Sequence, residues 1–76
     1  MAEDKELLRR LSLSIYELGL STRVCNCLRA DGILTLGDIA KSKRSVFQSY
    51  RNFGAKCLAE IDKVLADAGL TYEYEL

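Results

Sequence analysis

The sequence predicts an all-α fold: a compact bundle of four to five short helices that contains a helix-hairpin-helix-like element. Apolar residues recur at helical spacing in several short segments, and no βαβ pattern is present. Five glycines and no proline punctuate the chain, which divides it into short pieces. A chain of 76 residues has room for one domain with a small core.

The first segment, residues 1–14, is a helix-prone lead-in or linker. Leu7, Leu8 and Leu11 share one helical face, and acidic residues precede basic ones, which suits the helix dipole. Residues 15–70 are expected to form the domain itself.

An irregular turn over residues 14–20 leads into the first core helix. This helix begins at Ser21 or Thr22, both good N-caps, runs to about Asp31 and stops before Gly32. The side chains expected to face the core are those of Val24, Cys25 and Leu28.

Two shorter helices follow. One runs from Thr35 or Leu36 to Ser42, and the next, capped by Ser42 or Ser45, ends near Tyr50. Their apolar sides are expected to comprise Leu36, Ile39 and Ala40 in the first, and Val46, Phe47 and Tyr50 in the second.

The last and longest helix runs from about Ala55 to Ala68 and is closed by Gly69. With the preceding helix and the turn at 51–54 it forms a helix–turn–helix-like hairpin. A C-terminal tail, residues 71–76, either lies extended over the core or remains loose. The apolar stripe of the long helix comprises Cys57, Ile61, Val64, Leu65 and Ala68.

Composition restricts the function. Apolar residues make up 49% and charged residues 29%, an ordinary globular balance, and eleven basic residues match eleven acidic ones. Net neutrality argues against bulk electrostatic capture of nucleic acid but allows a local basic patch. No membrane-spanning run and no signal-peptide pattern is present, so we expect a cytoplasmic protein.

Metal, cofactor and catalytic chemistry are not expected. The sequence has three cysteines and no histidine, too few ligands for a typical zinc site, and no nucleotide-binding glycine motif. The two cysteines that are close in sequence lack a nearby base. We therefore predict a non-enzymatic protein without a metal, a cofactor or a small-molecule substrate.

The stretch Arg51–Cys57 (RNFGAKC) is the strongest candidate for a binding site. A glycine at the entrance of a helix lets another backbone approach, and it leaves the first N–H groups free to hold an anion. Lys56 adds positive charge at the same place. This pattern suits a phosphate of nucleic acid, although Gly54 could instead serve only the geometry of the turn.

Two blocks in this order are similar to one known family. Leu20–Ala30 (LSTRVCNCLRA) resembles that family's arginine–x–x–asparagine–cysteine–leucine–lysine helix, and Asn52–Ile61 (NFGAKCLAEI) resembles its asparagine–leucine–glycine block. Thr35–Ile39 and Ala66–Leu70 match its glycine–aspartate turn and the end of its last helix. Over about Ile15–Leu70, the sequence thus resembles the C-terminal domain of the bacterial RNA polymerase alpha subunit.

The resemblance implies binding to the minor groove of A/T-rich DNA upstream of promoters. Arg23 matches the arginine that enters the groove, Asn26 and Cys27 match further DNA-contacting positions, and Arg29 matches a phosphate-facing one. A donor-only guanidinium suits a narrow groove that has enhanced negative potential and acceptor atoms on its floor. Recognition would therefore follow the shape of the groove.

The second block implies the backbone-binding part of the site. Asn52, Gly54, Lys56 and Cys57 match its turn, and Glu60 matches an acidic residue that supports the arginine. Glu60 could equally form only a surface pair with Lys56.

Three departures from the family pattern favour an alternative. Cys57 replaces a serine, Ala55 a lysine, and Gly19 an acidic residue that touches the sigma factor in some members. The alternative function is a protein–protein interaction module that docks on RNA polymerase, a sigma factor or a regulator. The leading hypothesis is a nucleoid-associated DNA-binding module that helps to recruit polymerase.

Overall fold

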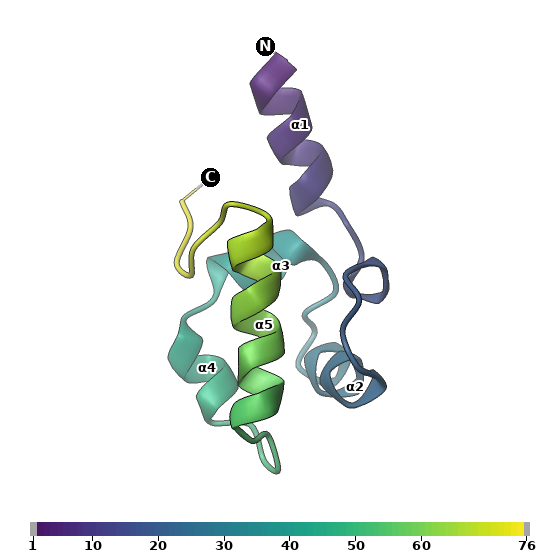
Figure 1. Ribbon diagram of the computed structural model, residues 1–76, viewed down its shortest axis with the longest axis vertical. Coiled ribbons are helices and arrows are strands. Elements are labelled where there is room, and N and C mark those ends of the chain that lie inside the picture. The colour runs from purple at the N-terminus through teal and green to yellow at the C-terminus, as the bar shows by residue number, and fades with distance from the viewer. Residues whose placement is uncertain (1, 76) are drawn as a thin grey trace.

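The computed structural model describes residues 2–75, with side chains from residue 5 onward. Helix α5 lies in the middle of the view in Figure 1, with α4 on one side, α2 on the other and α3 behind its upper part. This arrangement confirms the predicted all-α fold class. The helices are α1 (Ala2–Leu11), the 3₁₀ helix η1 (Ile15–Glu17), α2 (Thr22–Ala30), α3 (Leu36–Lys41), α4 (Arg44–Gln48) and α5 (Ala55–Asp67).

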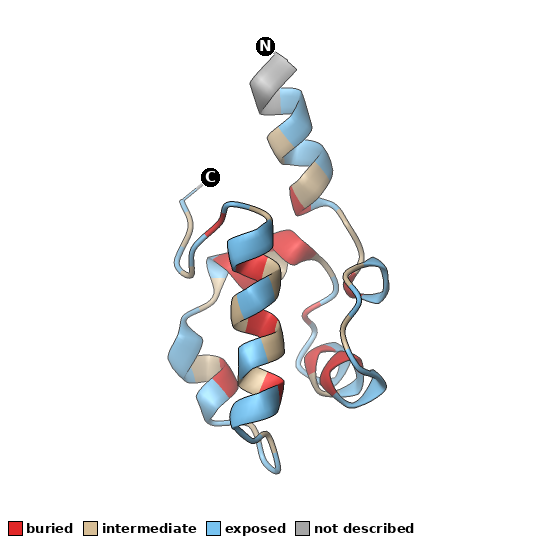
Figure 2. Cartoon of the chain, viewed as in Figure 1, coloured by how far each residue is buried: buried red, intermediate tan, exposed pale blue. Residues whose placement is uncertain are grey.

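The core lies where the apolar faces of α2, α3, α4 and α5 meet, as the buried positions in Figure 2 show. The predicted inward residues of α2 and α3 are all buried, and Phe47 is fully buried at the centre. Of the three leucines that share a face of α1, Leu7 and Leu11 pack on the core, whereas Leu8 is 63% exposed. The buried apolar residues are Leu11, Ile15, Val24, Cys25, Leu28, Ile33, Leu36, Ile39, Ala40, Phe47, Cys57, Ile61, Leu65 and Leu70.

The segment before α2 is more regular than the sequence predicts. Ser14 caps η1, and its hydroxyl accepts from the Tyr16 N–H while Glu17 accepts from the Ser14 N–H. α1 is attached to the far end of the bundle, since Arg10 Nη1 donates to the carbonyl of Ala68 at 2.9 Å. The C-terminal part of α1 is therefore held against the bundle, while its N-terminal part projects away from it (Figure 1).

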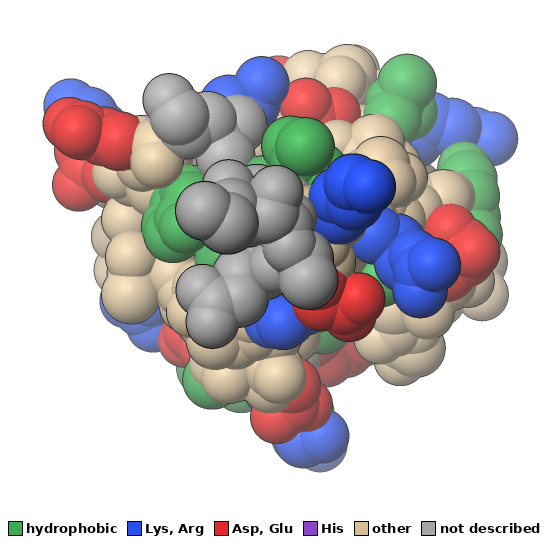
Figure 3. All heavy atoms as spheres, turned by 90° about the horizontal axis from the view of Figure 1, so that it is seen from above, with side chains coloured by type: hydrophobic (Ala, Val, Ile, Leu, Met, Phe, Trp, Pro, Cys, Tyr) green, Lys and Arg blue, Asp and Glu red, His purple; other side chains and the backbone are tan. Residues whose placement is uncertain are grey.

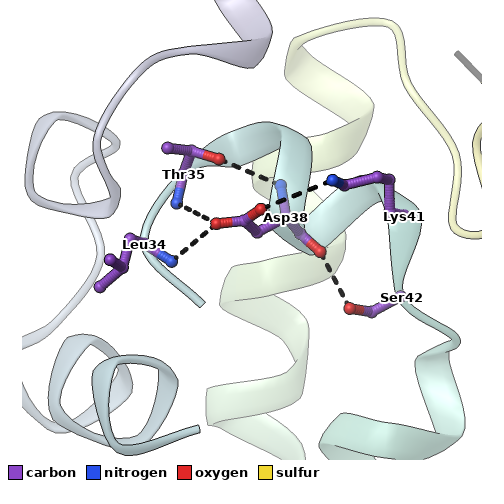
Figure 4. Close-up of polar contacts among 5 residues, drawn as sticks. All are labelled: Leu34, Thr35, Asp38, Lys41 and Ser42. Atoms are coloured by element: carbon purple, nitrogen blue, oxygen red, sulfur yellow. Dashed lines mark hydrogen bonds and ion pairs between the residues drawn. The ribbon is translucent and has the colours of Figure 1, made fainter. Parts of the chain in front are cut away.

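The entrance of α3 is a reciprocal capping box, drawn in Figure 4. The Thr35 hydroxyl accepts from the Asp38 N–H, and Asp38 Oδ2 accepts from the N–H groups of Leu34 and Thr35 at 3.1 and 3.2 Å. Burial raises the pKa of Asp38, but these hydrogen bonds and the charge of Lys41 outweigh it and hold that pKa below its usual value. The capping carboxylate is thus stabilised in its charged form.

The cap of α4 differs from the predicted one. Lys43, not Ser42 or Ser45, occupies the N-cap, and this helix has no side-chain cap. The Ser42 hydroxyl instead donates back to the Asp38 carbonyl at the end of α3. A serine in a short linker can serve either helix, and here the preceding one takes it.

The C-terminal tail packs over the core, which decides between the two predicted alternatives. The N–H groups of Glu73 and Tyr74 donate to the carbonyls of Ser42 and Ala40. The Tyr72 ring lies 6.0 Å from that of Phe47. Its hydroxyl and the guanidinium of Arg44 both donate to the Asp62 carboxylate, which joins the tail, α4 and α5.

Among residues 2–75, no helix combines the length and the apolar character that crossing a bilayer requires.

Candidate nucleic-acid interface

The candidate site lies where α2 meets the turn between α4 and α5, at the end of the molecule away from both termini (Figure 1). The exposed side chain of Arg23 joins the two elements, because its Nη2 donates to the backbone carbonyl of Asn52 at 2.5 Å. The two sequence blocks are therefore adjacent in space. An arginine in the first turn of α2 is held beside the entrance of α5.

The start of α2 is fixed by a carboxylate from α5. Glu60 Oε1 accepts from the Ser21 N–H at 2.7 Å, and Glu60 Oε2 accepts from the Ser21 hydroxyl at 3.1 Å. Ser21 is the N-cap, and its hydroxyl also accepts from the Val24 N–H. The support that the resemblance implies for Arg23 is therefore indirect: Glu60 positions the cap two residues before the arginine.

Aromatic side chains attach the α4–α5 turn to the core. The Phe53 ring packs edge-on against Tyr50 at 5.2 Å, and Tyr50 packs edge-on against buried Phe47 at 5.5 Å. Burial, followed by the hydrogen bond to Asp31, raises the pKa of Tyr50. Because this row of rings reaches the core, the turn is a supported element that can hold Asn52 in place.

Gly54 is not needed for the fold. It is the N-cap of α5 with φ −78° and ψ −178°, an extended conformation open to any residue. A Cβ atom added there would meet nothing within 4 Å. The alternative that Gly54 serves turn geometry is therefore wrong, and its missing side chain leaves open space in front of the helix.

The first turn of α5 has unpaired donors. α5 has no side-chain cap, so the N–H groups of its first turn point outward without a partner among the described residues. Lys56 is exposed beside them, whereas the Cys57 side chain is only 8% exposed and belongs to the core. Cys57 could thus contribute its backbone N–H to a ligand, but hardly its thiol.

The remaining candidates lie along α2. Asn26 is exposed, and Cys27 is half-buried and lines a hollow together with Tyr50 and Arg51. Helical geometry places Arg29 about 120° around the helix from Arg23. The structure thus brings Arg23, Cys27 and the turn together and sets Arg29 on another flank.

Comparisons with known proteins identify the family. The family model that describes the C-terminal domain of the alpha subunit of bacterial RNA polymerase matches residues 1–67. This protein belongs to that family. It is similar to "DNA-directed RNA polymerase subunit alpha" of Porphyromonas gingivalis, with 41% identity over 97% of this sequence and 23% of the relative. The same-named protein of Aquifex aeolicus is 45% identical over 86% of this sequence and 20% of the relative.

The sequence thus spans about a quarter or less of the relatives' length. Membership in the alpha C-terminal domain family agrees with the compact helical fold and with both resembling blocks.

The link of Ser21 to Glu60 and the place of Arg51 beside the candidate site were not predicted from the sequence. Ser21 was assigned only a capping role, and its link to Glu60 spans 39 positions, so no local pattern reveals it. Arg51 is exposed at the rim of a shallow hollow of about 300 Å³ between the end of α2 and the turn. Arg51 is the first residue of the stretch Arg51–Cys57, and its basic side chain in that stretch was the signal that could have identified it. The hollow is lined by Cys27, Ala30, Asp31, Tyr50 and Arg51.

The opposite end of the molecule bears side chains of both charges. Viewed from that end, basic and acidic side chains are interspersed over the visible surface (Figure 3). Among the described residues, no three histidine, cysteine, aspartate or glutamate side chains are grouped to hold a metal ion.

Proposed function

We propose that this protein is a non-catalytic DNA-binding module that contacts the minor groove of A/T-rich DNA upstream of promoters and helps to recruit RNA polymerase. One observation carries the proposal: the exposed guanidinium of Arg23 is held 2.5 Å from the turn that opens α5. A groove-reading group and a phosphate-binding turn are thereby parts of one surface. Nucleoid association would follow from this activity.

Arg23 suits the minor groove for electrostatic reasons. A narrow A-tract groove concentrates negative potential and attracts an inserted guanidinium. Its floor presents only acceptors at A·T pairs. A guanidinium has five N–H donors, and the bond to Asn52 uses one of them, so the others remain for the groove.

The entrance of α5 suits the sugar–phosphate backbone. Unpaired N–H groups, the positive end of the helix dipole and Lys56 converge on the open space in front of Gly54. Such contacts fix position and carry no sequence information. We therefore assign groove reading to Arg23, Asn26 and the edge of Cys27, with Arg29 on a flanking phosphate.

The similar proteins support the wider role. Their names describe subunits of DNA-directed RNA polymerase, and this sequence matches a limited part of each. We infer that the module acts together with polymerase subunits, a sigma factor or regulators.

The test is a titration of the isotope-labelled protein with a short A-tract duplex and with a G·C-rich duplex, each at two salt concentrations. Arg23→Gln should abolish the preference for the A-tract. Arg9→Gln removes the same charge from an exposed position on α1 and should change nothing. Equal binding of both duplexes by the unaltered protein, or no binding at low salt, would contradict the proposal.

One observation favours a second function, that of a protein-docking module. Neither Ala55 nor the buried Cys57 supplies a charged or hydroxyl donor at the entrance of α5. In that case Arg23→Gln would leave DNA titrations unchanged and would weaken capture of purified RNA polymerase.

A further inference from the structure

We propose that Asn52 is a positioning residue: its backbone carbonyl, held by a left-handed conformation, orders Arg23 for the groove. This inference rests on the proposed function of Arg23. It assigns the importance of position 52 to the backbone carbonyl, whereas a direct contact of the Asn52 side chain with DNA would depend on the amide.

The geometry at Asn52 is unusual. Its φ is +58°, and among residues 2–75 only Glu73 is another non-glycine residue with positive φ. Asparagine tolerates this region better than most residues because its short polar amide bonds locally to the backbone. Here the side-chain amide has no hydrogen-bond partner among the described residues, whereas the carbonyl oxygen accepts from Arg23.

The conformation and the contact are connected. Phe53 is anchored on Tyr50, and Gly54 opens α5, so the backbone must reverse direction between α4 and α5 within a few residues. The left-handed residue makes this reversal and orients its carbonyl toward α2. A change in φ at position 52 would therefore turn the acceptor away from Arg23.

Ordering Arg23 in advance should strengthen binding. A free arginine side chain samples many rotamers, and fixing them during association weakens affinity. In the structure Nη2 of the guanidinium is already held by the Asn52 carbonyl, and the remaining N–H groups of the guanidinium can still donate to DNA. The loss of side-chain entropy of Arg23 therefore occurs on folding and no longer weakens the binding of DNA.

Two substitutions separate the main-chain role from a side-chain role. Asn52→Gly removes the amide but adopts positive φ readily, whereas Asn52→Ala removes the same amide and disfavours that conformation. We expect A-tract affinity to stay close to that of the unaltered protein in the glycine variant. In the alanine variant it should fall about fivefold, the energetic cost of a left-handed alanine expressed as a dissociation constant.

A second readout needs no DNA. The Arg23 Nη2–H signals of the free protein, from the nitrogen that donates to Asn52, should be distinct and slow to exchange in the unaltered protein and in Asn52→Gly. They should move toward the averaged position of Arg9 in Asn52→Ala. Urea denaturation of each variant checks that the fold is retained.

Equal loss of affinity in both variants would overturn the inference in favour of a side-chain contact. Unchanged affinity in both, or an averaged Arg23 signal in the unaltered protein, would also overturn it. If the unaltered protein fails to bind the A-tract while the Arg23 signals follow the expected pattern, the proposed function fails and the positioning role of Asn52 stands.

Discussion

At the scale of single residues, the candidate site combines an exposed arginine with two groups that hold it in place. The Arg23 guanidinium is fixed by the Asn52 carbonyl, and the start of its helix is fixed at the N-cap by Glu60. Neither supporting bond depends on burial, since both lie at the surface. Mutations here should therefore separate stability from binding more cleanly than mutations in the core would.

Gly54→Ser should stabilise the fold while weakening DNA binding. Serine is a strong N-cap residue, the φ and ψ at this position suit it, and a Cβ atom meets no neighbour. We expect a gain of about 0.5 kcal/mol in the free energy of unfolding. The serine hydroxyl would also occupy a backbone N–H that a phosphate needs, so A-tract affinity should fall several-fold. Urea denaturation and fluorescence anisotropy measure the two effects, and a variant that binds as well as the unaltered protein would show that no phosphate approaches Gly54.

Glu60→Gln should destabilise the fold through α2. The substitution removes a charged acceptor from the Ser21 N–H and hydroxyl, and hydrogen bonds to charged groups are stronger than neutral ones. We expect a loss of about 1 kcal/mol in the free energy of unfolding. Asp67→Asn on the same helix disturbs only an exposed pair with Lys63 and should cost little. Equal losses of stability for the two variants in thermal melts would mean that the hydrogen bonds from Ser21 to Glu60 do not stabilise the fold.

At the scale of elements, local patterns predicted the helices well where capping and periodicity agree. Three predictions agree with the structure: Ser21 as the N-cap of α2, the buried side of α3, and Gly69 at the end of α5. Each depends only on neighbours within four positions. The misplaced cap of α4 depends on which of two adjacent helices Ser42 serves, and helical periodicity does not decide this. The turn η1 was missed although it has a local signature, because Ser14 and Glu17 form a capping box within three positions.

The sequence could suggest which residues belong to the candidate site, but not the hydrogen bonds that connect them. Family resemblance selected Arg23, Asn52 and Glu60, yet it could not show that the Asn52 carbonyl, rather than its amide, accepts from Arg23. Nor could it show that Glu60 acts through Ser21. Both features depend on backbone conformation and on contacts between distant segments.

The α3 capping box should make the fold sensitive to acid. The pKa of Asp38 is lowered in the folded state, so its contribution is complete above the unfolded value, about 3.9, and is lost as pH falls through the folded value. Asp38→Asn should cost about 0.5–1 kcal/mol at pH 7 and less in acid. Asp62 has its pKa lowered by Arg44 in the same direction, so some acid dependence should persist. Urea denaturation between pH 2 and pH 7 measures this; a constant difference between variant and unaltered protein would contradict it.

At the scale of the whole molecule, the fold separates the candidate site from the two termini. The molecule is 41 Å long and about half as wide; the α4–α5 turn lies at one end, α1 at the other, and the C-terminal tail in the half nearer α1 (Figure 1). Hydrogen bonds of Tyr72 and Arg10 hold the tail and the C-terminal part of α1 against the bundle, away from the candidate site. Segments joined to either terminus would therefore leave the interface unobstructed.

Net neutrality should make one module a weak binder that gains strongly from a second. Eleven basic and eleven acidic residues give little long-range attraction, so affinity depends on a few local contacts. Two copies joined by a flexible linker should bind a duplex with two A-tracts about 100-fold more tightly than one copy, because the second contact forms at high effective concentration. A matched tandem protein with Arg23→Gln in one copy should bind like a single module. Calorimetry compares the three proteins, and a tandem protein no tighter than its mutated control would show that Arg23 does not carry the interaction.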